Sequence, residues 1–104
     1  MAFDITVSRE EFDLALKQVK KFNKGKKPFD LILKFDGTAL LLETPMATFS
    51  ASGTGTSDVS IVLPGRMMIL MLGTFPTSDA LAFRLDGSSL KIDRLTIPCK
   101  VVVE

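Results

Sequence analysis

The sequence predicts an α+β fold, in which two helices pack on antiparallel sheets formed by a duplicated unit of strand, helix and three strands. Three observations predict it. The stretch 29–51 matches the stretch 79–101, each half opens with an alternating apolar pattern, and a helical apolar pattern follows each opening. A period near fifty residues divides the chain into internal repeats at about 1–54 and 57–104. Because 104 residues correspond to a single domain, the two copies should share one core.

The repeat is read from residues 31–51 placed over residues 81–101, an offset of fifty. Asp36-Gly37 then falls on Asp86-Gly87, and the flanking apolar positions coincide. An Asp-Gly pair between two alternating apolar runs is a strong signal for a β-hairpin, because glycine accepts the positive φ of the turn. Each half is therefore predicted to contain a hairpin at the same place.

The first half opens with a strand and a capped helix. Phe3, Ile5 and Val7 alternate with polar residues, as in a half-buried strand. Ser8 followed by Glu11 is a capping box, in which serine caps the first helical turn and glutamate reaches back to it. The helix that follows has one apolar face and two stop residues. Phe12, Ala15, Leu16 and Val19 form the face, and Asn23 and Gly25 end the helix.

The remaining elements follow from apolar alternation and turn residues. In the first half, strands are expected at 29–35, 39–44 and 47–51, with 53–57 as a short connection between the halves. In the second half, a strand at 59–63 leads into a short helix at about 66–72, and strands follow at 81–85, 90–92 and 95–103. The opening elements align at an offset of 56 residues and the later strands at fifty, so the first half carries six extra residues after its helix.

Composition says more about the cellular location of the protein than about its binding partner. The formal net charge is +1, so the whole molecule is not a general binder of polyanions. The N-terminus does not have the pattern of a signal peptide, and no apolar run reaches the roughly 18 residues of a membrane span. Cys99 is the one cysteine, and it overlays Phe49 in the repeat. We expect an inert core thiol in a cytoplasmic protein without membrane association.

Six lysines lie in one short window that contains no acidic residue. This lysine cluster comprises Lys17, Lys20, Lys21, Lys24, Lys26 and Lys27, and it spans the end of the first helix and the six-residue insertion. Lysines in such a cluster can neutralise the phosphates of duplex DNA, with binding that is independent of sequence and strongly dependent on salt. The alternative is a solvated helix end, since lysines also complement the negative end of the helix dipole.

The second predicted helix is too apolar for an ordinary surface helix. Aligned with the first helix, it places Met67 and Ile69 where the first has Glu11 and Asp13, and Leu70 is a further candidate for exposure. One interpretation is that loops and core bury this helix on all sides. The other is that Met67, Ile69 and Leu70 form an apolar interface with another subunit or a partner.

Residues that carry catalysis are scarce. The chain has no histidine, and its one cysteine and scattered carboxylates form no nucleophile–base pair and no metal-ligand spacing. Gly53 and Gly55 lack the glycine pattern and following helix of a phosphate-binding loop. We therefore expect no enzymatic activity, no cofactor and no bound metal.

The predicted order of elements resembles one domain of the DNA sliding clamps, the ring-shaped processivity factors of replicative polymerases. The resemblance rests on the strand and capped helix Phe3–Lys20, the two Asp-Gly hairpins and the strand-into-helix passage Val59–Leu72, and it covers essentially the whole chain. In that family each domain is a doubled β-α-β-β-β unit with pseudo-twofold symmetry. The helices line the hole through which DNA passes. The resemblance implies that residues 1–104 form a single clamp-like domain.

The resemblance also implies partners. The lysine cluster, with Arg9 or Arg66 as further contacts, would bind duplex DNA, and replication proteins would be further partners. Edge strands and the apolar second helix would join copies into a homo-oligomer. Clamps resemble rings of six such domains, so a closed ring of this chain would need about six copies. The alternative is a protein-interaction module that keeps the fold but neither binds nor encircles DNA. The second helix, whose only charge is Arg66, favours this alternative.

Overall fold

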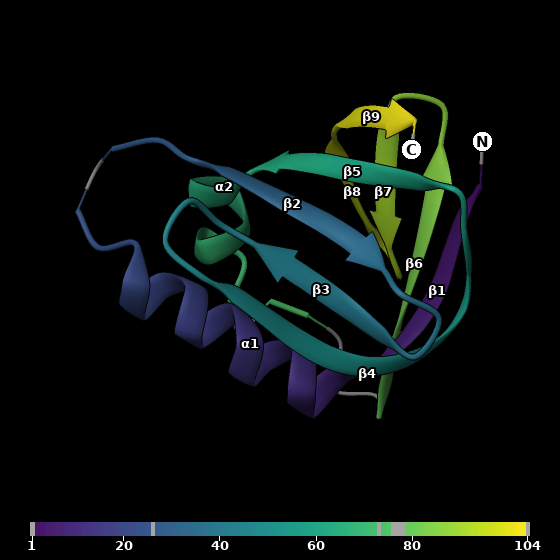
Figure 1. Cartoon of the computed structure of the whole chain (residues 1–104), viewed down its shortest axis with the longest axis horizontal. Coiled ribbons are helices and arrows are strands. Elements are labelled where there is room, and N and C mark those ends of the chain that lie inside the picture. Colours follow the sequence, from purple (N-terminus) through teal and green to yellow (C-terminus); the bar gives the residue numbers. More distant parts are fainter. Residues whose placement is uncertain (1, 26, 73, 76–78, 104) are drawn as a thin grey trace.

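The computed structural model describes residues 2–25, 27–72, 74–75 and 79–103, and this part of the chain contains two helices and nine strands. In chain order they are β1 (Phe3–Ser8), α1 (Arg9–Phe22), β2 (Asp30–Phe35), β3 (Ala39–Glu43), β4 (Thr48–Ser57), β5 (Val59–Pro64), α2 (Gly65–Leu70), β6 (Ala80–Asp86), β7 (Ser89–Ile92), β8 (Leu95–Pro98) and β9 (Lys100–Val103) (Figure 1). The predicted α+β class is confirmed.

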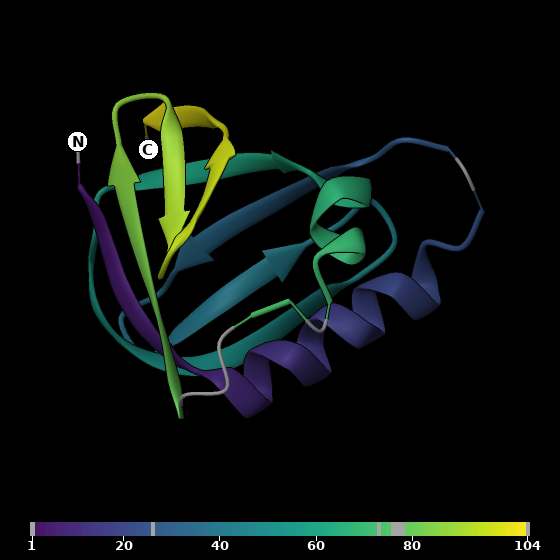
Figure 2. The ribbon, with the colours of Figure 1, turned by 180° about the vertical axis from the view of Figure 1, so that it is seen from behind.

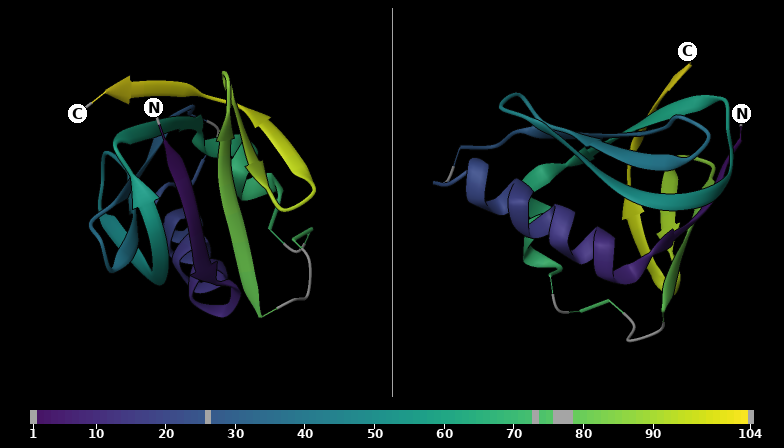
Figure 3. Two further views of the ribbon diagram at one scale, coloured as in Figure 1. Left: turned by 90° about the vertical axis from the view of Figure 1, so that its right-hand side faces the viewer. Right: turned by 60° about the horizontal axis from the view of Figure 1, so that its bottom comes forward.

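The nine strands form one antiparallel sheet in the order β8-β7-β6-β1-β4-β3-β2-β5-β9. The sheet curls, so that β2, β3, β4 and β5 form one side of the molecule and β6, β7 and β8 stand across it (Figures 1 and 3). Both helices lie behind β2–β5 in the first view and come forward in Figure 2. The core fills the space between the helices and the inner side of the curled sheet.

The strand pairings of the two halves correspond to one another. β1 pairs with β4 and β6, and β5 pairs with β9 and β2, all antiparallel. β2 and β3 form a hairpin across Asp36 and Gly37, and β6 and β7 form one across Asp86 and Gly87. The two glycines have φ of 103° and 63°, the left-handed conformation that glycine adopts without a steric penalty. Both predicted hairpins are confirmed.

α1 begins and packs as its sequence predicts. The Ser8 hydroxyl accepts a hydrogen bond from the Glu11 backbone N–H at 3.3 Å, which caps the helix. All four predicted apolar positions are buried. Phe12 packs edge-on against Phe75 and Phe83, with ring centroids 5.5 and 5.1 Å apart. The apolar periodicity of the helix therefore fixes which face meets the core.

β4 is longer than predicted, because residues 53–57 are not a connection. They continue the strand and pair with β1, and Gly55 lies opposite Ile5. A Cβ on Gly55 would lie 2.2 Å from the Asp4 carbonyl oxygen, and the φ of Gly55 is 140°. Only glycine permits the two backbones to come this close. Gly53 and Gly55, which suggested a connection, are required by this close approach.

The predicted final strand at 95–103 is two strands. β8 pairs with β7, and the chain then bends at Cys99 so that β9 pairs with β5 at the other end of the sheet. The Cys99 N–H donates to the Ser88 carbonyl at 2.9 Å. Cys99 packs against the core but is only partly buried, so the prediction of a core thiol is confirmed only in part. Even so, desolvation raises the pKa of this thiol above its ordinary value of 9.0.

α2 is shorter than predicted and covers Gly65–Leu70. Met68 is fully buried, as its alignment with Phe12 suggests. Leu72, which aligns with Leu16 of α1, lies beyond the end of the helix and is partly buried. The helix thus contributes one deep anchor to the core and leaves its other apolar residues nearer the surface.

Candidate functional site

The lysine cluster lies at the C-terminal end of α1 and in the segment that leads to β2. Its five described members are exposed: Lys17, Lys20, Lys21, Lys24 and Lys27. Lys26 lies outside the described residues. Within the described ranges, ion pairs join Arg9 to Asp13, Lys34 to Glu43 and Lys91 to Asp86, and none involves the cluster. The cluster therefore presents positive charge that no carboxylate of the described chain neutralises.

The outer face of α1 is only partly basic. The buried positions place Glu10, Leu14, Lys17 and Lys21 on the opposite face, at helical spacing. Leu14 is 55 % exposed and Glu10 is also exposed. On this outer face, positive charge is thus confined to the C-terminal half of the helix. Leu14 was not singled out by sequence reasoning, although its spacing from Phe12 already places it off the buried face.

α2 presents apolar side chains beside this end of α1. Leu70 is 81 % exposed and Met67 is 38 % exposed, so both reach the surface as predicted. Ile69 is only partly exposed and packs against the core. Of the two sequence interpretations, complete burial of the helix is therefore wrong for Met67 and Leu70.

A cavity of about 470 Å³ lies between the end of α1, the following loop and α2. Lys20 and Lys24 line it on the side of α1, and Ile69 and Leu70 line it on the side of α2. The Asn23 side-chain amide donates to the Val19 carbonyl at 2.9 Å and so satisfies a carbonyl at the helix end. Basic and apolar groups therefore meet at this junction.

Arg66 also belongs to this junction, but its guanidinium is bound to the chain itself. Its Nε donates to the Lys27 carbonyl at 2.9 Å, and its Nη1 donates to the Asn23 carbonyl. The guanidinium also lies over the Phe29 ring, 4.9 Å from the centroid. Arg9 is 2.8 Å from Asp13. The two arginines proposed from sequence as further phosphate contacts thus have other partners.

Arg66 lies in the first turn of α2. A cation in the first turn of a helix opposes the helix dipole, so its charge is expected to be used elsewhere. Gly65, the first residue of α2, also packs against the loop before β2. A Cβ there would lie 2.2 Å from the Phe29 ring, and the Gly65 N–H donates to the Phe29 carbonyl at 2.9 Å. The start of α2 and the loop before β2 are therefore fitted to each other.

A second feature is an open strand edge beside α1. The Gly53 N–H donates to the Thr38 carbonyl at 3.1 Å and so points towards β3. Because backbone N–H groups alternate in direction along a strand, the N–H of Ser52 points away from β3. The Glu11 carboxylate accepts from this N–H at 3.1 Å and from the Ser52 hydroxyl at 2.9 Å. Glu11 therefore bonds β4, not the start of its own helix, and the second half of the predicted capping box is wrong.

Beyond Ser52 the same edge borders a groove of about 460 Å³ between β4 and α1. Thr48 and Ser50 follow the same alternation as Ser52, so their backbone groups face the groove. Leu14 and Phe49 supply apolar surface along it. Open strand edges of this kind are where a strand of another chain can add.

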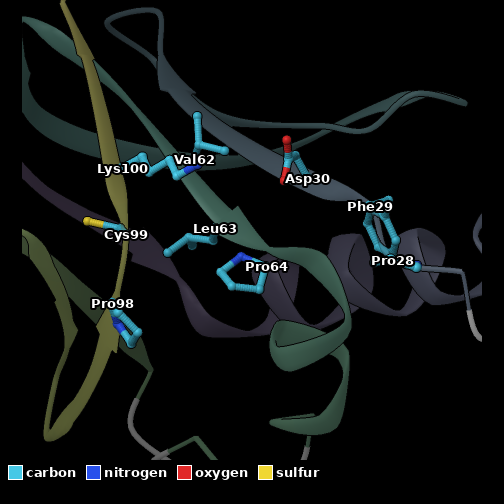
Figure 4. Close-up of a pocket in the computed structure, with 9 residues that line it drawn as sticks. All are labelled: Pro28, Phe29, Asp30, Val62, Leu63, Pro64, Pro98, Cys99 and Lys100. Atoms are coloured by element: carbon cyan, nitrogen blue, oxygen red, sulfur yellow. The ribbon is translucent and has the colours of Figure 1, made fainter.

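A larger groove, of about 640 Å³, lies where β9 diverges from β5 (Figure 4). Pro64 and Pro98 line it, and because proline lacks an N–H, strand addition is disfavoured there. Asp30 and Lys100 lie at its edges, and Cys99 lines it. Burial raises the pKa of the Cys99 thiol, which disfavours the nucleophilic thiolate.

No helix among the described residues is long and apolar enough to cross a membrane. The same residues contain no group of three or more histidine, cysteine, aspartate or glutamate side chains that could hold a metal ion. Comparison with protein-family models, curated proteins and solved structures gives no match. Function must therefore be inferred from the chain's own residues.

Proposed function

We propose that this chain is a non-catalytic, clamp-like domain that self-associates and contacts duplex DNA through the phosphate backbone. The lysine cluster carries the proposal, because its five described members are exposed at one end of α1 and form no ion pair. Each lysine that neutralises a phosphate releases counterions, which favours binding to any base sequence.

The clamp-like part is supported by the strand pairing. β1 and β5 each pair with two strands in corresponding ways, and each leads directly into a helix. A doubled β-α-β-β-β unit with pseudo-twofold symmetry accounts for this correspondence. Both helices lie on the same side of the curled sheet (Figure 2). In a clamp-like arrangement that side would face the DNA.

Self-association is supported by two surfaces. The β4 edge at Thr48 and Ser50 is open beside α1, and β8 and β9 are the two ends of the sheet. A second copy could add one of its edge strands to this groove and cover exposed Leu14. Replication proteins as further partners follow from the resemblance to clamps alone.

The DNA contact is tested by fluorescence anisotropy of a labelled duplex over a salt series. If all five described lysines contact phosphates, the slope of log Kobs against log salt should be about −4.5 per chain, since each contributes about −0.9. Replacing Lys17 and Lys21 by glutamine should make the slope less negative by about 1.8. Lys91→Gln is the control, because Lys91 is an exposed β7 lysine outside the cluster. No retention of the wild-type protein at about 50 mM salt would overturn the DNA contact.

A second candidate function is a protein-interaction module without DNA binding. The exposed Leu70 and Met67 favour it, because apolar side chains contribute little to contacts with a phosphate backbone. Under this function, Leu70→Lys should abolish association with the partner or with a second copy, and Lys17→Gln should have no effect. Unchanged association of Leu70→Lys would exclude α2 as the interface.

A further inference from the structure

We infer that Arg66 is a positioning residue, which holds the lysine-bearing segment after α1 against α2 so that the lysine cluster acts as one surface. The inference rests on the proposed DNA contact and deepens it. The segment from Asn23 to Phe29 contains the six-residue insertion that distinguishes the first half from the second. An insertion of this length would ordinarily be free to vary in conformation. Here its backbone is bound by a side chain from the other half of the chain.

Arg66 makes three contacts with the segment, in addition to the hydrogen bond from the Gly65 N–H to the Phe29 carbonyl. Nε of Arg66 donates to the Lys27 carbonyl at 2.9 Å, and Nη1 donates to the Asn23 carbonyl. The two carbonyls lie four residues apart in the sequence, so one planar guanidinium holds Asn23 and Lys27 together. The third contact is the guanidinium over the Phe29 ring, 4.9 Å from its centroid. Arginine suits this role because its donors form a rigid fork and its plane stacks on aromatic rings.

The geometry explains why this arginine is not itself a phosphate contact. Two of its nitrogens already donate to carbonyls, and its side chain is only partly exposed. Lys20 and Lys24, in contrast, are exposed on the walls of the neighbouring cavity. Arg66 would therefore raise DNA affinity by keeping lysines from α1 and from the loop close together. Preorganised groups lose less conformational entropy on binding than groups on a flexible loop.

The test compares Arg66→Met and Arg66→Lys with Arg84→Met, a control that removes one exposed arginine from β6. NMR order parameters of the Lys24 and Lys27 amides report the loop. They should be about 0.85 in the wild type and in Arg84→Met, and below about 0.6 in Arg66→Met. Arg66→Lys keeps the charge but not the fork, so it should loosen the loop as well, and it keeps the test decisive if Arg66→Met does not fold.

DNA binding separates positioning from direct contact and from a purely structural role. Positioning predicts that affinity falls about three- to tenfold in both Arg66 variants while the salt slope stays that of the wild type. A slope less negative by about 0.9 in Arg66→Met would mean that Arg66 contacts a phosphate, and would overturn the inference. Wild-type affinity in either folded Arg66 variant would overturn it too. If the wild-type protein fails to bind DNA, the proposed function is lost, and the order parameters alone decide whether Arg66 holds the loop.

Discussion

Replacing Gly55 by alanine should separate β4 from β1. A Cβ at this position would lie 2.2 Å from the Asp4 carbonyl oxygen and 2.8 Å from the Ile5 Cα, and both are backbone atoms of β1. The strands would have to move apart by on the order of 1 Å to restore an ordinary contact distance. The φ of 140° adds strain, because an alanine rarely adopts it.

The magnitude follows from these two costs. Strain at an unfavourable φ costs about 1–3 kcal/mol, and each ladder hydrogen bond weakened between β1 and β4 costs about 0.5–1.5 kcal/mol. Together they give a loss of about 3–5 kcal/mol in the free energy of unfolding. For a domain of this size, a loss of that order lowers Tm by more than about 12 °C.

Gly37→Ala is the matched control. Gly37 also has a positive φ, of 103°, but an added Cβ there would meet no atom within 4 Å. It should show the strain without the clash, so the difference between the two variants isolates the close approach of β4 to β1. Urea unfolding followed by far-ultraviolet circular dichroism gives both values. Equal losses in the two variants, within about 0.5 kcal/mol, would refute the pairing of residues 53–57 with β1.

Three further predictions concern the core, a hairpin and a surface. Phe12→Ala removes a fully buried ring that packs edge-on against two others, so it should cost about 3–5 kcal/mol in a urea titration; a cost near zero would contradict the assigned core. Asp36 accepts hydrogen bonds from the backbone N–H groups of Thr38 and Ala39, and these hold the pKa of its carboxyl below the ordinary value of 3.8. The stabilisation is present above that value and is lost as pH falls through the lowered pKa. Asp36→Ala should therefore be less stable than the wild type at neutral pH and approach it in strong acid, whereas a constant difference would exclude this cause. Leu70→Lys replaces a side chain that is 81 % exposed, so Tm should change little. Under the second candidate function, in which α2 is an interface, sedimentation velocity should show a smaller oligomer, and an unchanged sedimentation coefficient would remove α2 from the interface.

The local order of elements could be read from the sequence because each element has its own signal. The apolar spacing from Phe12 to Val19 fixed the buried face of α1, and both Asp-Gly pairs marked real hairpins. These signals are local, since periodicity and turn chemistry depend on residues near in the chain.

Pairing between distant strands could not be read in the same way. Gly53 and Gly55 resemble a loop by composition, and only the presence of β1 against them shows why small residues are required. Cys99 sits at a bend that separates β8 from β9, and this bend depends on β5 and β7 as partners. Tertiary context decided these positions, as it does for β-structure in general.

In the candidate site too, features with a local sequence signal could be predicted and features that depend on distant residues could not. The lysine cluster was visible as a run of like charges, and exposure of Met67 followed from its alignment with Glu11. The same alignment predicted exposure of Ile69, which packs partly against the core. The place of Arg66 in the first turn of α2 indicates that its charge is used elsewhere, but its partners could not be predicted, because two of them are backbone carbonyls that any sequence would supply. The hydrogen bond of Glu11 was predicted wrongly for a related reason, since its partner Ser52 lies on a distant strand.

The most direct test of a self-associating, DNA-contacting clamp-like domain is the mass of the protein in solution, measured by sedimentation equilibrium with and without duplex DNA. The proposal predicts an oligomer of the 11.4 kDa chain that co-sediments with duplex DNA at about 50 mM salt and dissociates from it as salt rises. Six copies per assembly would fit a closed ring. A stable 11.4 kDa monomer, unchanged by DNA at low salt, would contradict it.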